Sequence, residues 1–168
     1  MKKEKLYIAY GSNLNLTQMK YRCPTAKVVG ETEIEDYELL FRGSKTGAYA
    51  TIEAREGSVV PVLIWSVKPK DEAALDRYEG YPKFYNKEFV ELEVGGEPAS
   101  AFVYVMTEGH SLGIPTDLYL KTIEEGYQAA GFDTKILNKA VEHTKERMES
   151  EQIGGFEHDT KFGLKWGL

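Results

Sequence analysis

Cysteine is almost absent from this sequence. The single one, Cys23, excludes an intrachain disulfide, and the N-terminus carries no apolar signal region. Disulfides form mainly in secreted proteins, whereas the thiols of cytosolic proteins are kept reduced. We therefore expect a cytoplasmic protein.

Histidine is scarce as well: His110, His143 and His158 are far apart and lack the short spacings of zinc ligands. Catalysis by a cysteine needs a lowered pKa, usually from a nearby histidine, and none of the three histidines is a sequence partner of Cys23, whose neighbours Arg22 and Pro24 offer no general base. We therefore expect Cys23 to be structural and expect no metal site. The stretch "GSNLN" also lacks the later glycine, lysine and Ser/Thr of a phosphate-binding loop, so we expect no cofactor.

Clusters of basic residues and long apolar runs are missing too. The net charge is −6, and no stretch concentrates lysine and arginine, so a nucleic-acid partner is not expected. Apolar runs such as "VVPVLIW" are far too short to cross a membrane. Neither a nucleic-acid partner nor a membrane is therefore expected, and a homodimer is left open.

The length and the order of the expected elements indicate the fold class. The 168 residues fit a single domain spanning 1–168, with enough chain to bury one core. Strands are expected within residues 5–106 and helices mainly after them, which favours an α+β fold. The expected strands cover 6–10, 26–43 with a break near Gly30, 48–57 and 59–67 joined by a turn at 56–58, 87–94, and 100–106 after a turn at 95–96.

Capping residues and apolar spacing predict the helices. A short helix is expected over 14–21, one over 69–78 that ends at Gly80, and one from Thr116 to Gly131. Residues 133–168 are expected to form a C-terminal helix over 133–149 and a tail from Glu151. Two glycine breaks are expected in this tail, with Trp166 packed back on the fold.

The stretch "YGSNLN" at residues 10–15 follows the apolar strand "KLYIA" and precedes the first expected helix. A turn in this position directs backbone N–H groups at one point and can hold an anion or an oxyanion. Gly11 would let a ligand approach closely, and Asn13 tolerates positive φ. Taken alone, the turn could equally be a plain connector.

A second stretch, "LDRYEGYPKFY" at residues 75–85, places Glu79 at the end of a helix and among aromatic side chains. The negative end of the helix dipole and apolar surroundings both disfavour the charged carboxylate. They would raise its pKa toward the range that suits general acid–base catalysis. A solvated glutamate at a helix end is the alternative.

These stretches occur together with "RCPTA", "ATI", "VYVM" and "IPTDLYL", in this order, and the sequence thereby resembles the γ-glutamylcyclotransferase-like family over about residues 5–130. The resemblance implies a small, closed or nearly closed mixed β-barrel with flanking helices. It implies that Glu79 is the catalytic acid/base. It also implies a substrate-holding loop and a pocket tyrosine, which are Tyr10, Gly11, Ser12, Asn13, Leu14 and Tyr119. Residues 133–168 exceed what minimal members need.

Members of this family convert a γ-glutamyl compound to 5-oxoproline and a free amine, without a metal or a nucleotide. The resemblance therefore implies the same reaction here, with a leaving group that is an amino acid, a dipeptide derived from glutathione, a cross-linked lysine or a biosynthetic amine. One alternative is a non-catalytic barrel that binds a small acidic metabolite, although a carboxylate at position 79 would disfavour an anionic ligand. Another is an interaction protein with an apolar patch around Trp166.

Overall fold

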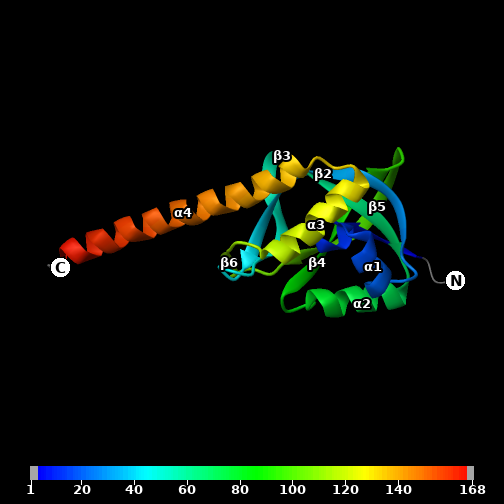
Figure 1. Cartoon of the computed structure of the whole chain (residues 1–168), viewed down its shortest axis with the longest axis horizontal. Coiled ribbons are helices and arrows are strands. Elements are labelled where there is room, and N and C mark those ends of the chain that lie inside the picture. The colour runs from blue at the N-terminus through cyan, green and yellow to red at the C-terminus, as the bar shows by residue number, and fades with distance from the viewer. Residues whose placement is uncertain (1–3, 166–168) are drawn as a thin grey trace.

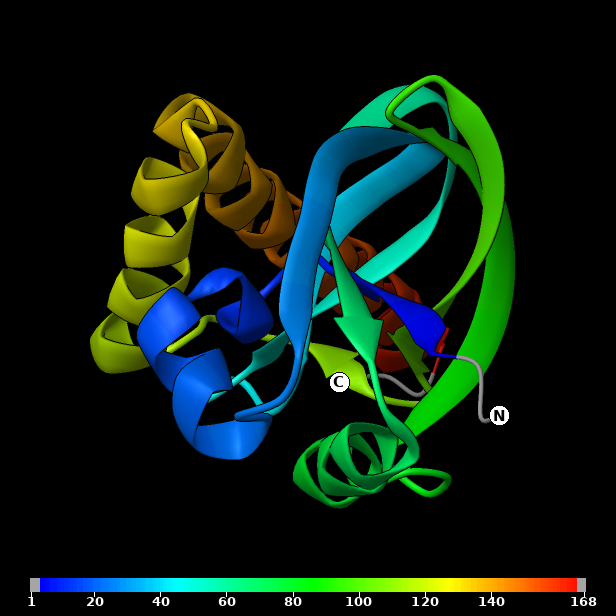
Figure 2. The same cartoon turned by 90° about the vertical axis from the view of Figure 1, so that its right-hand side faces the viewer.

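The computed structural model describes the backbone of residues 4–165 and the side chains of residues 4–151. One mixed six-stranded sheet, with the order β4-β5-β1-β3-β2-β6, curls into a half-barrel with helices on its outside (Figures 1 and 2). The expected α+β class and the barrel-like sheet are confirmed. The strands are β1 (Lys5–Ala9), β2 (Lys27–Gly43), β3 (Tyr49–Val67), β4 (Tyr85–Val94), β5 (Glu97–Met106) and β6 (Ser111–Leu112).

Strands β2 and β3 form one long antiparallel hairpin, and this corrects the expectation of two strands joined by a turn at 56–58. Both halves of β3 pair with β2, and the extra residues are absorbed by a shift of register between Glu35 and Tyr37. At this bulge Asp36 has a φ of 63° and its side chain accepts a hydrogen bond from the N–H of Gly57, whose φ is 85°. A bulge bends and twists a strand, which helps the sheet to curl.

The short strand β1 lies in the middle of the sheet. It pairs antiparallel with β3 from Lys5 to Ala9, and it lies parallel to β5 at Tyr7. Strands β4 and β5 form the expected second hairpin, closed by the turn at 95–96. Strand β1 ends at Ala9 between two longer strands, and the residues that follow it, 10–15, are buried.

The first three α-helices have the expected positions. Helix α1 (Leu16–Arg22) follows the one-turn helix η1 (Ser12–Leu14), and α2 (Pro69–Glu79) ends at Gly80 with a φ of 68°. Helix α3 (Asp117–Ala130) begins where the Thr116 side chain accepts a hydrogen bond from a backbone N–H, and it ends at Gly131.

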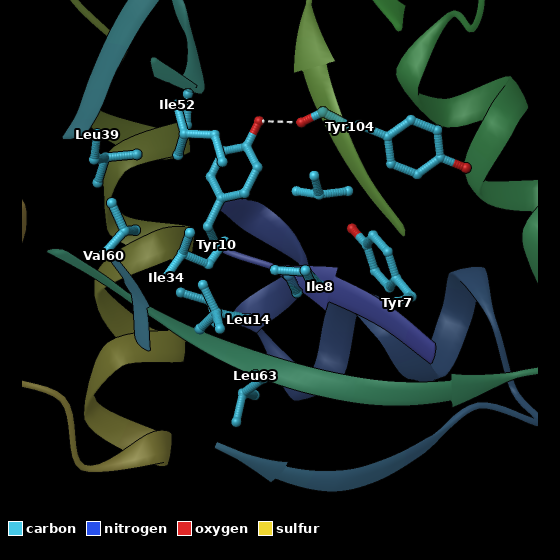
Figure 3. Close-up of a cluster of buried hydrophobic side chains, with 14 of the residues drawn as sticks. Tyr7, Ile8, Tyr10, Leu14, Ile34, Leu39, Ile52, Val60, Leu63 and Tyr104 are labelled. Carbon is cyan, nitrogen blue, oxygen red and sulfur yellow. Dashed lines mark hydrogen bonds between the residues drawn. The ribbon is translucent and has the colours of Figure 1, made fainter. Parts of the chain in front are cut away.

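A glycine inside α3 brings this helix against the turn that follows β1. A Cβ atom at Gly126 would lie 2.6 Å from Cβ of Leu14 and 2.7 Å from its carbonyl carbon, so a larger residue would push the two apart. Leu14 is fully buried in the hydrophobic core, together with Ile8 and Ile52 (Figure 3). The close packing explains why the turn has a fixed position.

Helix α4 (Thr134–Lys165) is much longer than expected. Its first part covers the expected helix, and Leu137, Ala140 and Thr144 are buried. The expected glycine breaks are wrong, because the helix continues through 154–155; a glycine costs a helix interior only about 1 kcal/mol. The end of α4 extends away from the sheet (Figure 1), and Trp166 lies outside the described residues.

None of the helices in the part of the chain that the structure describes is both long and apolar enough to cross a membrane.

Candidate active site

A cavity of about 390 Å³ lies where the turn after β1 faces the end of α2. It falls within the size range of small-molecule sites. Tyrosine dominates its wall, with Phe84 and Ala50 beside it. The lining tyrosines are Tyr7, Tyr10, Tyr49, Tyr78, Tyr85, Tyr104 and Tyr119.

The structure places all but one of the expected site residues around this cavity. Those on its wall are Tyr10, Gly11, Ser12, Asn13, Tyr119 and Glu79, which come from three separate parts of the chain. The exception is Leu14, whose side chain is fully buried in the core and is not on the wall. Its side chain packs in the core and thereby holds the turn in place.

In the turn after β1, the backbone N–H groups of two described residues, Gly11 and Ser12, are free to bind a ligand. Strand β1 ends at Ala9, and the hydrogen bonds of the turn are made by the N–H groups of Leu14 and Asn15, which donate to the carbonyls of Gly11 and Ser12 at 3.0 Å each. Among the described residues, the N–H groups of Gly11 and Ser12 donate to no acceptor. These N–H groups lie outside the strand ladder and fit the expected anion nest.

Gly11 has little room for a side chain. A Cβ atom there would lie 3.2 Å from Cβ of Ala50 and 3.7 Å from the hydroxyl of Tyr119. A larger side chain would therefore press on the cavity wall and cover the N–H groups.

Hydrogen bonds hold the tyrosine rings of the wall in place. The Tyr10 hydroxyl donates to the Tyr104 carbonyl at 2.6 Å (Figure 3), and the Tyr85 hydroxyl donates to the Ala50 carbonyl at 2.6 Å. The Tyr119 hydroxyl accepts from the Ala50 N–H at 3.0 Å. These bonds link the wall to the backbone of β3 and β5, so the cavity is pre-formed by the sheet.

Glu79 is the last residue of α2 and is half-buried on the cavity wall. Burial raises the pKa of its carboxyl to about 7, and the positive charge of Arg22 partly opposes this rise. A carboxyl with this pKa is present in both protonation states near neutral pH, which is what an acid/base catalyst needs. The alternative of a fully solvated glutamate does not fit this placement.

Tyr7 and Tyr10, two tyrosines near Glu79, remain neutral. Burial, and after it the nearby charge of Glu79, raises the pKa of Tyr7 and Tyr10 well above the usual range. Glu79 therefore changes its charge near neutral pH beside two tyrosines that do not. The arrangement can move one proton beside a ligand whose negative oxygen is held by the turn.

Sequence reasoning did not identify most of the tyrosine wall or Arg22. Tyr104 lies in the supporting motif "VYVM" and Arg22 precedes Cys23 in "RCPTA". Residues 101–104 of β5 are all buried, so alternation along this strand does not indicate that its tyrosine faces the cavity. The position of Arg22 depends on how α1 packs, which no local pattern reveals.

The curled sheet and this cavity define a class of small α+β proteins in which a turn after a central strand faces a helix-end glutamate. The family model described as "Gamma-glutamyl cyclotransferase, AIG2-like" matches residues 7–126. The chain belongs to this family, as the sequence resemblance indicated.

Relatives and solved structures agree with this assignment. The chain is similar to a "Gamma-glutamylcyclotransferase" of Bos taurus (29% identical, covering 80% of this chain and 76% of the relative) and to one of Homo sapiens (30% identical, 80% and 76%). A solved structure named "Gamma-glutamyl cyclotransferase" is 26% identical with a TM-score of 0.73, covering 82% of this chain and 86% of that one. YkqA from Bacillus subtilis, 19% identical with a TM-score of 0.70 over 86% of this chain and 55% of that one, shares the fold.

Proposed function

We propose that this protein is a γ-glutamyl cyclotransferase that converts a γ-glutamyl amine, amino acid or peptide to 5-oxoproline and the free amine. The observation that carries the proposal is the position of Glu79, whose pKa is raised to about 7, on one wall of a cavity that also contains the open N–H groups of Gly11 and Ser12. The names of the relatives support the same activity.

In this reaction the substrate supplies its own nucleophile. The ionised Glu79 takes a proton from the α-ammonium group, and the freed amine attacks the γ-carbonyl carbon to form the new C–N bond. The protonated Glu79 then gives this proton to the distal nitrogen as its bond to that carbon breaks, and the second proton lost by the attacking nitrogen is taken up by the released amine, which leaves as an ammonium ion. One carboxyl thus serves both proton transfers, and it returns to its starting state.

The turn after β1 would bind the negative oxygens of the substrate. Its N–H groups suit either the α-carboxylate or the oxyanion that develops on the γ-carbonyl, and both roles are consistent with the geometry. The rigid tyrosine wall would hold the flexible γ-glutamyl chain folded, and orientation of this kind can contribute on the order of 7–11 kcal/mol to catalysis.

The proposal is tested by incubating the purified protein with γ-glutamyl amino acids, γ-glutamyl peptides, γ-glutamyl-lysine and simple γ-glutamyl amines. We expect 5-oxoproline to accumulate with at least one of them, in equal amount to the released amine. A non-catalytic metabolite-binding protein, the alternative, would bind such compounds or 5-oxoproline without turnover. Binding without product across this panel would favour that alternative.

Replacing Gly11 with valine should abolish binding of the γ-glutamyl compound that the panel identifies. The first added carbon already meets Ala50 at 3.2 Å, and the branched side chain would cover the N–H groups of the turn. Isothermal titration with the wild type and the variant measures the loss. Unchanged binding by a folded Gly11→Val protein would show that the ligand does not use this turn.

Replacing Cys23 with serine should leave kcat/KM unchanged. Burial, and after it the charge of Asp71, raises the pKa of the Cys23 thiol to about 11, so the thiolate is rare at neutral pH. The thiol donates to the carbonyl of Asp71 at 3.5 Å, a bond that a serine hydroxyl can replace. Treatment of the native protein with iodoacetamide checks the same point, and inactivation that substrate prevents would assign Cys23 a catalytic role.

A further inference from the structure

Arg22, the last residue of α1, connects three elements around the cavity. One guanidinium nitrogen donates to the side-chain oxygen of Asn13, and another donates to Oε1 of Gln18 at 3.0 Å. The guanidinium carbon also lies 3.4 Å from the centre of the Tyr78 ring, so the cation stacks on the residue that precedes Glu79. Arg22 therefore touches both the turn after β1 and the end of α2.

The hydrogen bonds of Asn13 extend this connection to the wall of the cavity. Because Arg22 can only donate, it fixes the oxygen of the Asn13 amide toward itself, and the amide nitrogen then donates to the Tyr7 hydroxyl at 2.8 Å. Asn13 is buried, so its orientation has few alternatives. Arg22 thereby sets which atoms of this residue face the cavity.

A second bond joins the same two elements. The Ser12 hydroxyl and the Tyr78 hydroxyl lie 2.9 Å apart and share a hydrogen bond. The Tyr78 ring is thus held from its face by Arg22 and from its hydroxyl by the turn. Two contacts on one ring fix both its position and its tilt, and Glu79 is attached to the same end of the helix.

Arg22 affects Glu79 through its charge as well as through its contacts. Among the groups around Glu79, Arg22 supplies the positive charge that opposes the effect of burial on the carboxyl. The other titratable or charged groups on the cavity wall with Glu79 are tyrosines from β1, the turn, β3, α2, β4, β5 and α3, together with Arg77. The tyrosines are Tyr7, Tyr10, Tyr49, Tyr78, Tyr85, Tyr104 and Tyr119.

We propose that Arg22 is a positioning residue of the active site: it holds the Tyr78–Glu79 end of α2 against the Ser12–Asn13 turn and adds a positive charge to the surroundings of Glu79. This role rests on the proposed function in one respect, namely that Glu79 is the acid/base. Its contacts to Asn13 and Tyr78 do not depend on that.

Two substitutions separate the two parts of this role. Arg22→Lys keeps the positive charge but loses the planar group that bonds two acceptors and stacks on a ring. We expect kcat/KM to fall, by up to about 10²-fold, because small displacements of reacting groups have effects of this size. The acid limb of the pH profile of kcat/KM should stay near its wild-type position.

Arg22→Gln removes the charge and the stacking together. The acid limb should now move to higher pH, because the cation that favours the ionised carboxyl is gone. Lys20→Gln is the matched control, since Lys20 lies exposed on the same helix two residues earlier and its substitution removes the same charge. It should change neither the rate nor the profile.

A measurement that needs no turnover keeps this inference separate from the proposed function. The protein is labelled with ¹³C at the glutamate carboxyl carbons, and the resonance that Glu79→Gln removes is followed by NMR from pH 4 to 9. In Arg22→Gln the titration midpoint of Glu79 should rise above that of the wild type and of Lys20→Gln.

If the wild type forms no 5-oxoproline from any γ-glutamyl compound, the proposed function fails while the NMR titration still tests Arg22. If the Glu79 midpoint is the same in Arg22→Gln and in the wild type, the electrostatic part of the inference is overturned. If Arg22→Lys retains full kcat/KM, the positioning part is overturned. Comparison of thermal unfolding with Lys20→Gln shows that the variants are folded.

Discussion

Replacing Glu79 with glutamine is expected to lower kcat by about 10²–10⁴, which is the usual contribution of a well-placed acid/base. Glutamine has nearly the same size as glutamate, but it cannot take the proton of the α-ammonium group or return it to the leaving nitrogen. Steady-state measurement of 5-oxoproline formation gives the ratio. A purified variant with nearly normal kcat would show that another group moves the proton.

The stability of this variant provides its control. The pKa of Glu79 is raised in the folded protein, so its contribution to stability is largest below the unfolded pKa of 4.5 and is lost as the pH rises through about 7. At pH 8 the free energy of unfolding of the glutamine variant should therefore equal that of the wild type or exceed it, by up to about 3 kcal/mol. Near pH 4 the difference should vanish. Chemical denaturation at the two pH values distinguishes loss of catalysis from loss of folding.

Removing the substrate's α-amine is expected to abolish turnover completely. In the proposed reaction this amine is the nucleophile, already attached at ring-closing distance from the γ-carbonyl. N-acetylation blocks it, and the glutaryl analogue, which has hydrogen in place of the amine, removes it without adding bulk. Neither compound should release its amine under conditions in which the parent compound is consumed.

The glutaryl analogue also serves as the steric control, because it is smaller than the substrate. It retains the groups that the turn would hold, so it should compete with the substrate for the cavity. Release of glutarate from this analogue would mean that water attacks the γ-carbonyl. The cyclisation mechanism would then be wrong.

Local patterns in the sequence were sufficient for much of the fold. Gly80 and Gly131 mark the ends of α2 and α3 as predicted, because both residues have the left-handed conformation that glycine adopts without strain. The turn at 56–58 was misread because Gly57 produces a bulge instead of reversing the chain. A bulge and a turn use the same residue types, and the long-range pairing with β2 decides between them.

The candidate site could be predicted only where a residue lies in a specific motif. Glu79 and the turn at 10–13 belong to such motifs, and the structure brings them to one cavity. Leu14 shares the motif, yet it packs against Gly126 in the core, because neighbouring residues in a one-turn helix point in different directions. Arg22 was missed because its role depends on contacts outside its own helix. Asn13 belongs to the turn before α1, and Tyr78 lies far along the sequence on α2.

The most direct test of the central claim follows the fate of the γ-carbonyl when the wild-type protein acts on a γ-glutamyl compound in H₂¹⁸O. The account predicts 5-oxoproline that contains no ¹⁸O, formed in equal amount to the free amine and with no earlier appearance of glutamate, because the attacking atom is the substrate's own nitrogen. Mass spectrometry of the products at early times gives the result. Free glutamate carrying one ¹⁸O in its γ-carboxylate would contradict the account.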